Sequence, residues 1–420
     1  MGEFRGVFPH RARPRAIIGS SSKVQDFLTQ QRTFPAGIVH LALALGGFAI
    51  GTTEFATMSL LPFLAQGLGI DEPTAGHVIS AYASGVVVGA PLIAVLSARV
   101  ARRTLLLGLM ITFALGNAAS SLAPTYGWML VARFASGLPH GAYFGISALV
   151  AASLVPAEQR TRAVGRVMLG LTVATIVGVP LANALGQALG WRWGFAVVAL
   201  LATATAAALW FVAPHDRPEP GASPLQELGA LKNGQVWLTL AIGAIGFGGL
   251  FAVYTYLAST LLEVTRVGPA AVPFVLAIFG IGLTLGNLIV PRFADRALMP
   301  TAGGLLLWSA ASLALYTVAT TSLWAICVAV LAIGIGGALG TVLQTRLMDV
   351  AGRAQGLAAS LNHSAFNTAN ALGPWLGGLA VAGGYGWAST GWVGCALALG
   401  GLAIWGLTML VDNGMEAVPA

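Results

Sequence analysis

The amino-acid sequence predicts an all-α membrane protein in which twelve transmembrane helices form two six-helix bundles. Three observations support this fold class. Of the 420 residues, 57% are hydrophobic and only 8% are charged, apolar segments of bilayer length recur along the chain, and the two halves of the chain repeat. Soluble domains contain roughly 25% charged residues, so this composition excludes a water-soluble globule.

Twelve apolar segments are long enough to cross a bilayer, which takes roughly 20 residues of helix. Most of the connections between them are short. In chain order the segments lie at about 36–64, 74–97, 104–123, 127–153, 163–189, 193–213, 235–262, 271–292, 300–320, 322–345, 356–383 and 388–411.

The longest connection divides the segments six and six, and it is rich in proline and charge. We therefore predict five regions along the chain. They are a disordered basic tail at 1–34, an N-terminal bundle at 35–213, a cytoplasmic linker at 214–234, a C-terminal bundle at 235–412 and a short tail at 413–420.

The basic residues predict the orientation in the membrane. Of the 21 Lys and Arg residues, only Arg192 and Arg266 fall in loops on the far side and Arg133 falls within a span, whereas the other 18 lie on the side of the N-terminal tail. Because Lys and Arg accumulate on the cytoplasmic side, both termini are expected in the cytoplasm.

The two halves are related by an offset of 197 residues. This offset aligns Gly85-Val-Val-Val-Gly89 with Gly282-Leu-Thr-Leu-Gly286, and it also places Gly137 on Gly334. A duplicated unit in the same orientation is the plan of transporters whose two bundles flank a central path. The paired glycine spacings let the second and eighth helices pack backbone to backbone.

Glu54 is the residue around which we build the function. It is the only one of the fourteen acids that falls clearly inside a predicted span. An ionised acid near the membrane centre costs about 3 kcal/mol, so such residues usually face a cavity or a partner. Glu54 is either a proton carrier whose surroundings alternate or a structural acid bonded to Thr52, Thr53 or a neighbouring helix.

Several motifs resemble the major facilitator superfamily. The loop after the second segment resembles its signature of glycine followed by a basic loop, through Gly85, Arg99, Arg102 and Arg103. Here Ala98 replaces the acid of that signature. The second half keeps the acid, as Gly282, Asp295 and Arg296.

Within this superfamily, the chain most closely resembles the drug:proton antiporter branch. Arg133-Phe-Ala-Ser-Gly137 resembles the motif of its fourth helix, and Gly178-Val-Pro180 resembles that of its fifth helix, where a bend can limit leak or serve as a structural kink. Together with Gly-x-Thr-Glu54-Phe, these motifs are similar to bacterial exporters of arabinose and related sugars, purine nucleosides and chloramphenicol. The resemblance implies that the first and fourth helices are neighbours.

Two further polar residues join the proton-coupling candidates. If the first and fourth helices are neighbours, Arg133 can form an ion pair with Glu54, or it can act as a strut bonded to backbone carbonyls. His140 lies seven residues after Arg133, hence on nearly the same face. Its unperturbed pKa of about 6.5 suits a proton relay, although a packing role is the alternative.

Substrate-binding candidates come from a polar stripe and from aromatic residues. The stripe in the eleventh segment is His363, Asn367 and Asn370, to which Asn183 and Gln344 are added. Amides suit hydroxyl-rich cargo because they donate and accept, but they also hold membrane helices together. The aromatic candidates for stacking on cargo are Phe55, Tyr82, Tyr143 and Tyr254.

The leading hypothesis is a secondary active exporter in the plasma (inner) membrane, in which inward proton flow drives a sugar, nucleoside or antibiotic outward. Proton-linked uptake is the alternative within transporters, and a membrane-embedded enzyme is a weaker one. ATP-driven export is disfavoured because neither Lys23 nor Lys232 lies in a phosphate-binding loop. We expect no cofactor, metal or nucleic acid, and a monomer whose partners are the substrate, protons and lipid.

Overall fold

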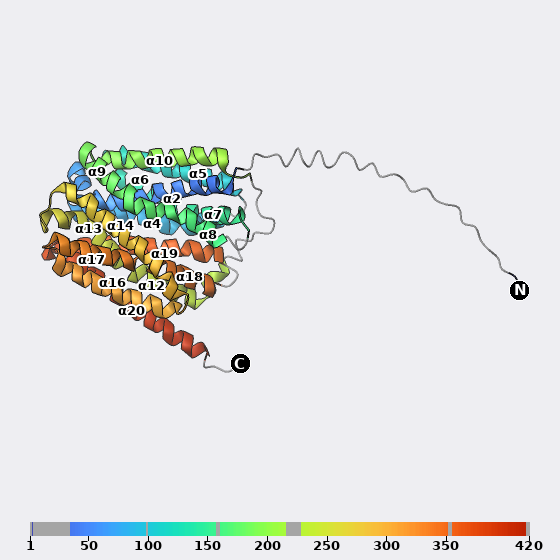
Figure 1. Cartoon of the computed structure of the whole chain (residues 1–420). Helices are drawn as coiled ribbons and strands as arrows, with labels where there is room; N and C mark the ends of the chain where they lie inside the picture. Colours follow the sequence, from blue (N-terminus) through green and yellow to red (C-terminus); the bar gives the residue numbers. More distant parts are fainter. Residues whose placement is uncertain are drawn as a thin grey trace.

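The computed structural model describes residues 34–97, 100–156, 160–215, 228–351 and 355–416, together with Gly2, and every regular element in these ranges is a helix (Figure 1). Nearly all of the predicted N-terminal tail, most of the linker, the last four residues and Arg99 lie outside the described residues.

The N-terminal half contains helices that follow the first six predicted segments. They are α2 (Ala36–Ser59), α3 (Leu61–Leu68), α4 (Glu72–Leu96), α5 (Arg102–Ser121), α6 (Tyr126–Gly137), α7 (His140–Ser153), α8 (Arg160–Val173), the π-helical turn η2 (Ala174–Gly178), α9 (Val179–Leu189) and α10 (Trp191–Val212).

The C-terminal half follows the remaining segments. Its elements are η3 (Leu228–Lys232), α12 (Gly234–Gly246), α13 (Gly248–Glu263), η4 (Pro269–Ala271), α14 (Val272–Ile289), α15 (Pro291–Ala294), α16 (Leu298–Ala319), α17 (Leu323–Gly336), α18 (Leu339–Val350), α19 (Gln355–Ala380), η5 (Val381–Tyr385) and α20 (Ser389–Glu416).

Ten helical stretches of the described chain are long and apolar enough to cross a membrane, and they coincide with ten of the twelve predicted segments. The other two predicted segments, 127–153 and 356–383, are occupied by α6 with α7 and by α19. The first is interrupted at Leu138 and Pro139, and the second carries the predicted polar stripe. A total of twelve spans and cytoplasmic termini stay predictions.

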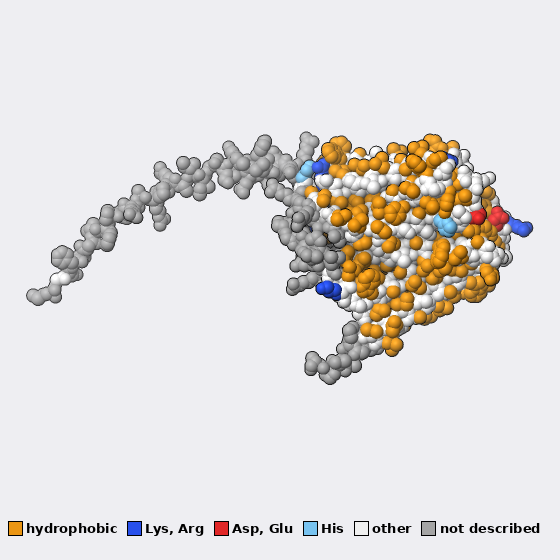
Figure 2. Space-filling view, turned by 180° about the vertical axis from the view of Figure 1, so that it is seen from behind, with side chains coloured by type: hydrophobic (Ala, Val, Ile, Leu, Met, Phe, Trp, Pro, Cys, Tyr) orange, Lys and Arg blue, Asp and Glu red, His pale blue; other side chains and the backbone are white. Residues whose placement is uncertain are grey.

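Successive spans run in alternate directions, so their ends gather at two ends of the bundle (Figure 1). We call these the Pro35 end, where α2 begins and α4 ends, and the Asp71 end, where α4 begins. Hydrophobic side chains cover the flank between the ends, and the charged side chains seen in Figure 2 lie toward the ends. This distribution matches a bilayer around the flank.

The 197-residue repeat is a structural repeat as well. Thr125 caps α6 by accepting a hydrogen bond from the backbone N–H of Trp128, and Ser322 caps α17 in the same way with Ala325. The two cap residues are separated by the same offset, so the fourth and tenth predicted segments begin alike.

Glycines bring the second span onto the fourth and, equivalently, the eighth onto the tenth. A Cβ atom added at Gly85 would collide with the carbonyl oxygen of Phe134, and one added at Gly282 would collide with that of Leu331. Gly137 and Gly334 make the reciprocal approaches from α6 and α17. These close backbone approaches occur within each half, between α4 and α6 and between α14 and α17, so the second and eighth helices pack on the fourth and tenth helices rather than on each other.

The two halves meet along several helix pairs, of which α4 with α19 is the most extensive, followed by α9 with α14 and α2 with α13. Near the Asp71 end, the hydroxyl of Ser259 donates to the carboxylate of Glu72 in the other half. Near the middle, Ser80 Oγ donates to the carbonyl oxygen of Ala371 at 3.0 Å. The seam between the halves thus holds polar contacts as well as apolar ones.

A first prediction tests the glycine crossings. Gly85→Val and Gly282→Val should each destabilise the fold by about 1–3 kcal/mol, because a side chain would have to displace backbone atoms. The measurement is the melting temperature of the detergent-purified protein. Gly108→Val is the matched control, because a Cβ there meets nothing within 4 Å. Equal melting temperatures for Gly85→Val and Gly108→Val would contradict the packing described.

Candidate functional site

Glu54 lies at the seam between the halves. It belongs to the last turns of α2, its side chain is only 8% exposed, and its Oε1 accepts a hydrogen bond from Nδ2 of Asn370 in α19 at 3.2 Å. Thr52 and Thr53 donate elsewhere, to the carbonyl of Phe48 and to Asn117. The carboxyl group is therefore held by the opposite half rather than by its own helix.

Arg133 is also buried, at 1% exposure, and it lies beside Glu54 without pairing with it. Its Nη1 donates to Thr53 Oγ1 at 3.1 Å, and its guanidinium carbon lies 4.2 Å from the centre of the Tyr82 ring. Of the two predicted alternatives, ion pair or backbone strut, the described contacts of Arg133 match neither. A hydroxyl and aromatic faces stabilise this buried cation instead.

Sequence reasoning missed part of this environment. The side chain of Asn117 accepts a hydrogen bond from Thr53 at 2.7 Å, and the ring of Phe195 lies 5.3 Å from the Arg133 guanidinium carbon. Asn117 was detectable as a polar residue within an apolar span. Nothing in the sequence pointed to Phe195, because its role depends on how α10 packs against α2 and α5.

Tyr82 links Arg133 to two histidines. The Tyr82 hydroxyl is 2.9 Å from Nδ1 of His140, and the His140 ring centre is 5.9 Å from that of His363 in the other half. Phe144 stacks in parallel on His363 at 5.3 Å. We call Arg133, Tyr82, His140 and His363 the polar track, because they form a contiguous line of side chains from α6 to α19.

The polar stripe of α19 faces the seam. Asn370 and Asn367 are buried, and within the described chain neither Oδ1 atom has a hydrogen-bond partner. The Nδ2 of Asn367 donates to the carbonyl of His363 on the same helix. Two buried acceptors are therefore available to a donor from a cargo molecule or from a neighbouring side chain.

Other predicted substrate residues serve the helix packing in this structure. The Tyr143 hydroxyl donates to the carbonyl of Leu43 at 2.8 Å and lies against Gly46, which joins α7 to α2. Nδ2 of Asn183 donates to the carbonyl of Ser59 at 2.8 Å, which joins α9 to α2. Gln344 is half-buried in α18, away from the polar track's described contacts.

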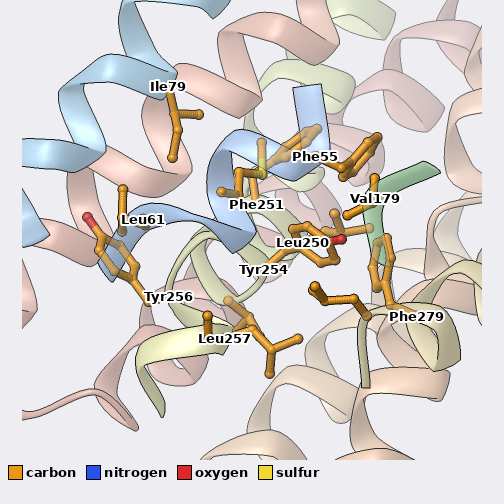
Figure 3. Close-up of a cluster of buried hydrophobic side chains, with 14 of the residues drawn as sticks. Phe55, Leu61, Ile79, Val179, Leu250, Phe251, Tyr254, Tyr256, Leu257 and Phe279 are labelled. Carbon is orange, nitrogen blue, oxygen red and sulfur yellow. The ribbon is translucent and has the colours of Figure 1, made fainter. Parts of the chain in front are cut away.

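Phe55, the neighbour of Glu54, belongs to an aromatic cluster that crosses the seam (Figure 3). Its ring is 5.3 Å from that of Tyr254 and 6.1 Å from that of Phe279, and it also stacks on Phe251. We call these four residues the aromatic plug. All four rings are buried, and they join α2 of the first half to α13 and α14 of the second half.

The predicted gating residues are distributed over the seam and the Pro35 end. Gly178 ends the π-helical turn that precedes Pro180, and the backbone of Thr175 in this turn lies against Gly280 of the other half.

At the Pro35 end, Arg103 packs on Trp210 and contacts His215. In the other half, Asp295 and Arg296 line a cavity of about 290 Å³ with Asp349. Arg102 lines a small hollow beside Arg103.

The comparisons with known proteins agree with this architecture. The Major Facilitator Superfamily matches residues 43–310. The inner membrane transport protein YdhP of Escherichia coli (strain K12) is 40% identical over 87% of this chain and 93% of its own length. The chloramphenicol resistance protein of Streptomyces lividans is 33% identical over 79% of this chain and 86% of its own length.

A solved structure shares the fold. The bacterial homolog of the human lysosomal transporter Spinster superposes with a TM-score of 0.69, at 17% identity, over 92% of this chain and 99% of that one. Family, relatives and fold are those of transporters and not of enzymes. The chain is therefore a multi-pass membrane transporter that belongs to the Major Facilitator Superfamily.

Proposed function

We propose that this transporter exports a small polar or amphipathic molecule, such as a sugar, a nucleoside or an antibiotic, in exchange for protons. The observation that carries the proposal is the buried carboxyl of Glu54 at the seam, bonded across it to Asn370. A titratable group that contacts both halves changes its surroundings whenever the halves separate. Such a group can bind a proton on one side of the membrane and release it on the other.

The polar track supplies the rest of the proposed coupling machinery. Arg133 places a permanent positive charge near Glu54 without neutralising it through a direct ion pair. Tyr82 and His140 extend the line of polar side chains from Arg133 toward His363. We propose that these groups stabilise the charged form of the site and relay protons, while alternating access is provided by rocking of the two halves about the seam.

The proposed cargo contacts come from both sides of the seam. His363 and Asn367 offer donors and acceptors, and Phe55 and Tyr254 offer aromatic faces. This combination suits a molecule with hydroxyl or amide groups and one ring. The similarity to a protein named for chloramphenicol resistance supports an amphipathic cargo and export rather than uptake. Proton-linked uptake remains the second candidate, because the same site serves either direction.

Replacing the acid tests the coupling. Glu54→Gln should reduce cargo uptake driven by a proton gradient into inverted vesicles by about tenfold or more, because the amide cannot exchange a proton. The assay uses labelled arabinose, inosine and chloramphenicol, with and without an imposed gradient. Glu263→Gln, at the exposed end of α13, is the control and should transport as the unmodified protein does. Gradient-driven uptake by Glu54→Gln at the normal rate would refute the coupling role.

Two substitutions in the stripe test the cargo contacts. His363→Ala combined with Asn367→Ala should weaken the apparent affinity for cargo by about thirtyfold, since two hydrogen bonds are lost and each is worth about 1 kcal/mol. Competition between the three labelled compounds measures the change. Tyr143→Phe, which removes a bond to the Leu43 carbonyl, should lower the melting temperature and leave the order of preference intact. An unchanged preference in the double variant would assign the stripe to helix packing.

A further inference from the structure

In the pair formed by Glu54 and Asn370, only one of the two polar atoms of the amide has a hydrogen-bond partner among the described residues. The Nδ2 of Asn370 donates to Glu54 Oε1 at 3.2 Å, but the Oδ1 of the same amide is fully buried and accepts no hydrogen bond within the described chain. A buried acceptor without a donor costs free energy. The pair is thus a geometry in which one of two available hydrogen bonds is made.

The missing bond depends on a proton. An ionised carboxylate can only accept hydrogen bonds, so it can satisfy the Nδ2 of an amide and leaves Oδ1 unpaired. A protonated carboxyl carries one O–H donor and keeps an acceptor oxygen, so it can pair with an amide through two bonds at once. Adding a proton from water to Glu54 therefore raises the number of hydrogen bonds with Asn370 from one to two and gives the buried Oδ1 the donor that the ionised carboxylate cannot supply.

This contact ties the halves together, because Glu54 belongs to α2 and Asn370 to α19. Nearby contacts across the same seam include the ring of Phe55 on that of Tyr254 and, further toward the Asp71 end, the Ser259 hydroxyl on Glu72. Strengthening the bond at Glu54 favours the arrangement in which these neighbours also touch. Weakening it favours separation of the halves at the Asp71 end.

We infer that Asn370 is the positioning residue through which protonation of Glu54 closes the Asp71 end of the transporter. The inference rests on the proposed function, since it says how the proton that Glu54 carries changes the conformation of the transporter. It moves Asn370 from the predicted cargo contacts to the coupling machinery. The Asp71 end is the outer end if the N-terminus is cytoplasmic, as the basic residues predict. Export in exchange for protons requires this sense of coupling, because a proton that binds at the open outer end must favour closure of that end.

The other groups around Glu54 do not provide the same link. Arg133 of α6 bonds to Thr53 and lies over the ring of Tyr82 of α4, and all three belong to the half that contains Glu54. His140 of α7 and His363 of α19 contact each other across the seam through their rings. Tyr254 of α13 meets Phe55, and its hydroxyl has no described partner.

The test is a distance measurement between the halves at the Asp71 end. Spin labels are attached at Leu122→Cys and Trp324→Cys, two positions that are 76% and 81% exposed in opposite halves, after Cys327→Ala and Cys395→Ala. Double electron–electron resonance then gives the populations of short and long distances between the labels as the pH is varied in lipid nanodiscs. The short distance reports the closed Asp71 end. With Asn370 present, the ratio of short to long distances should rise by up to about tenfold per unit fall in pH, the limit for one proton.

Substitutions of the pair give the decisive comparison. In Asn370→Leu the ratio should vary clearly less with pH over the same range, because one proton no longer changes the number of bonds between the halves and only the burial of the carboxyl still depends on its protonation. Asn370→Gln keeps the amide and should restore the dependence at least in part. The exchange variant Glu54→Gln with Asn370→Asp, which places the acid on α19 and the amide on α2, should also restore it.

The matched control is Ser80→Ala, which removes the hydrogen bond from Ser80 to the Ala371 carbonyl between the same two halves without touching Glu54. It should shift the populations and keep their pH dependence. Full pH dependence in Asn370→Leu, or its absence in the exchange variant, would overturn the inference while leaving the proposed function intact. A ratio that ignores pH even with Glu54 and Asn370 present would instead refute the proposed proton coupling itself.

Discussion

The structure depends on one unfavourable placement, a carboxyl group buried where two apolar bundles meet. Removing an acid from water is costly, and the cost is met here by a hydrogen bond that comes from the opposite half. In the proposed transport cycle, a contact of this kind is broken and remade each time the halves move. The position of Glu54 therefore links its chemistry to the conformation of the whole molecule.

The proposed movement also needs rigid bodies, for which the glycine crossings provide close packing within each half. In each half, two spans approach so closely that no side chain fits between their backbones, at Gly85 and Gly137 and again at Gly282 and Gly334. Close backbone packing is the main source of cohesion between helices that are surrounded by lipid. The polar track and the aromatic plug are attached to these crossings, because Tyr82 and Phe279 supply the carbonyl groups that Gly137 and Gly334 touch.

The duplicated scaffold carries different chemistry in its two halves. At the offset of 197 residues, the polar residues of the first half correspond to apolar ones in the second: Glu54 to Phe251, Tyr82 to Phe279 and Arg133 to Val330. Phe251 and Phe279 belong to the aromatic plug, and Val330 is buried in the same core. At these three positions one copy thus holds polar groups, and the other holds buried apolar ones.

The sequence alone determined the apolar segments, their repeat, the transporter family and the isolation of Glu54, because hydropathy and the cost of a charge in lipid are local properties of the chain. It also placed Arg133, His140 and the α19 stripe among the polar groups within the apolar segments. Only the tertiary structure decided which of these side chains contact one another. It directed Arg133 to Thr53 and Tyr82, made Tyr143 and Asn183 links between helices, and brought Asn370 to Glu54 across 316 residues of chain. Such pairings follow from the rotation and packing of whole helices, which no local pattern of residues specifies.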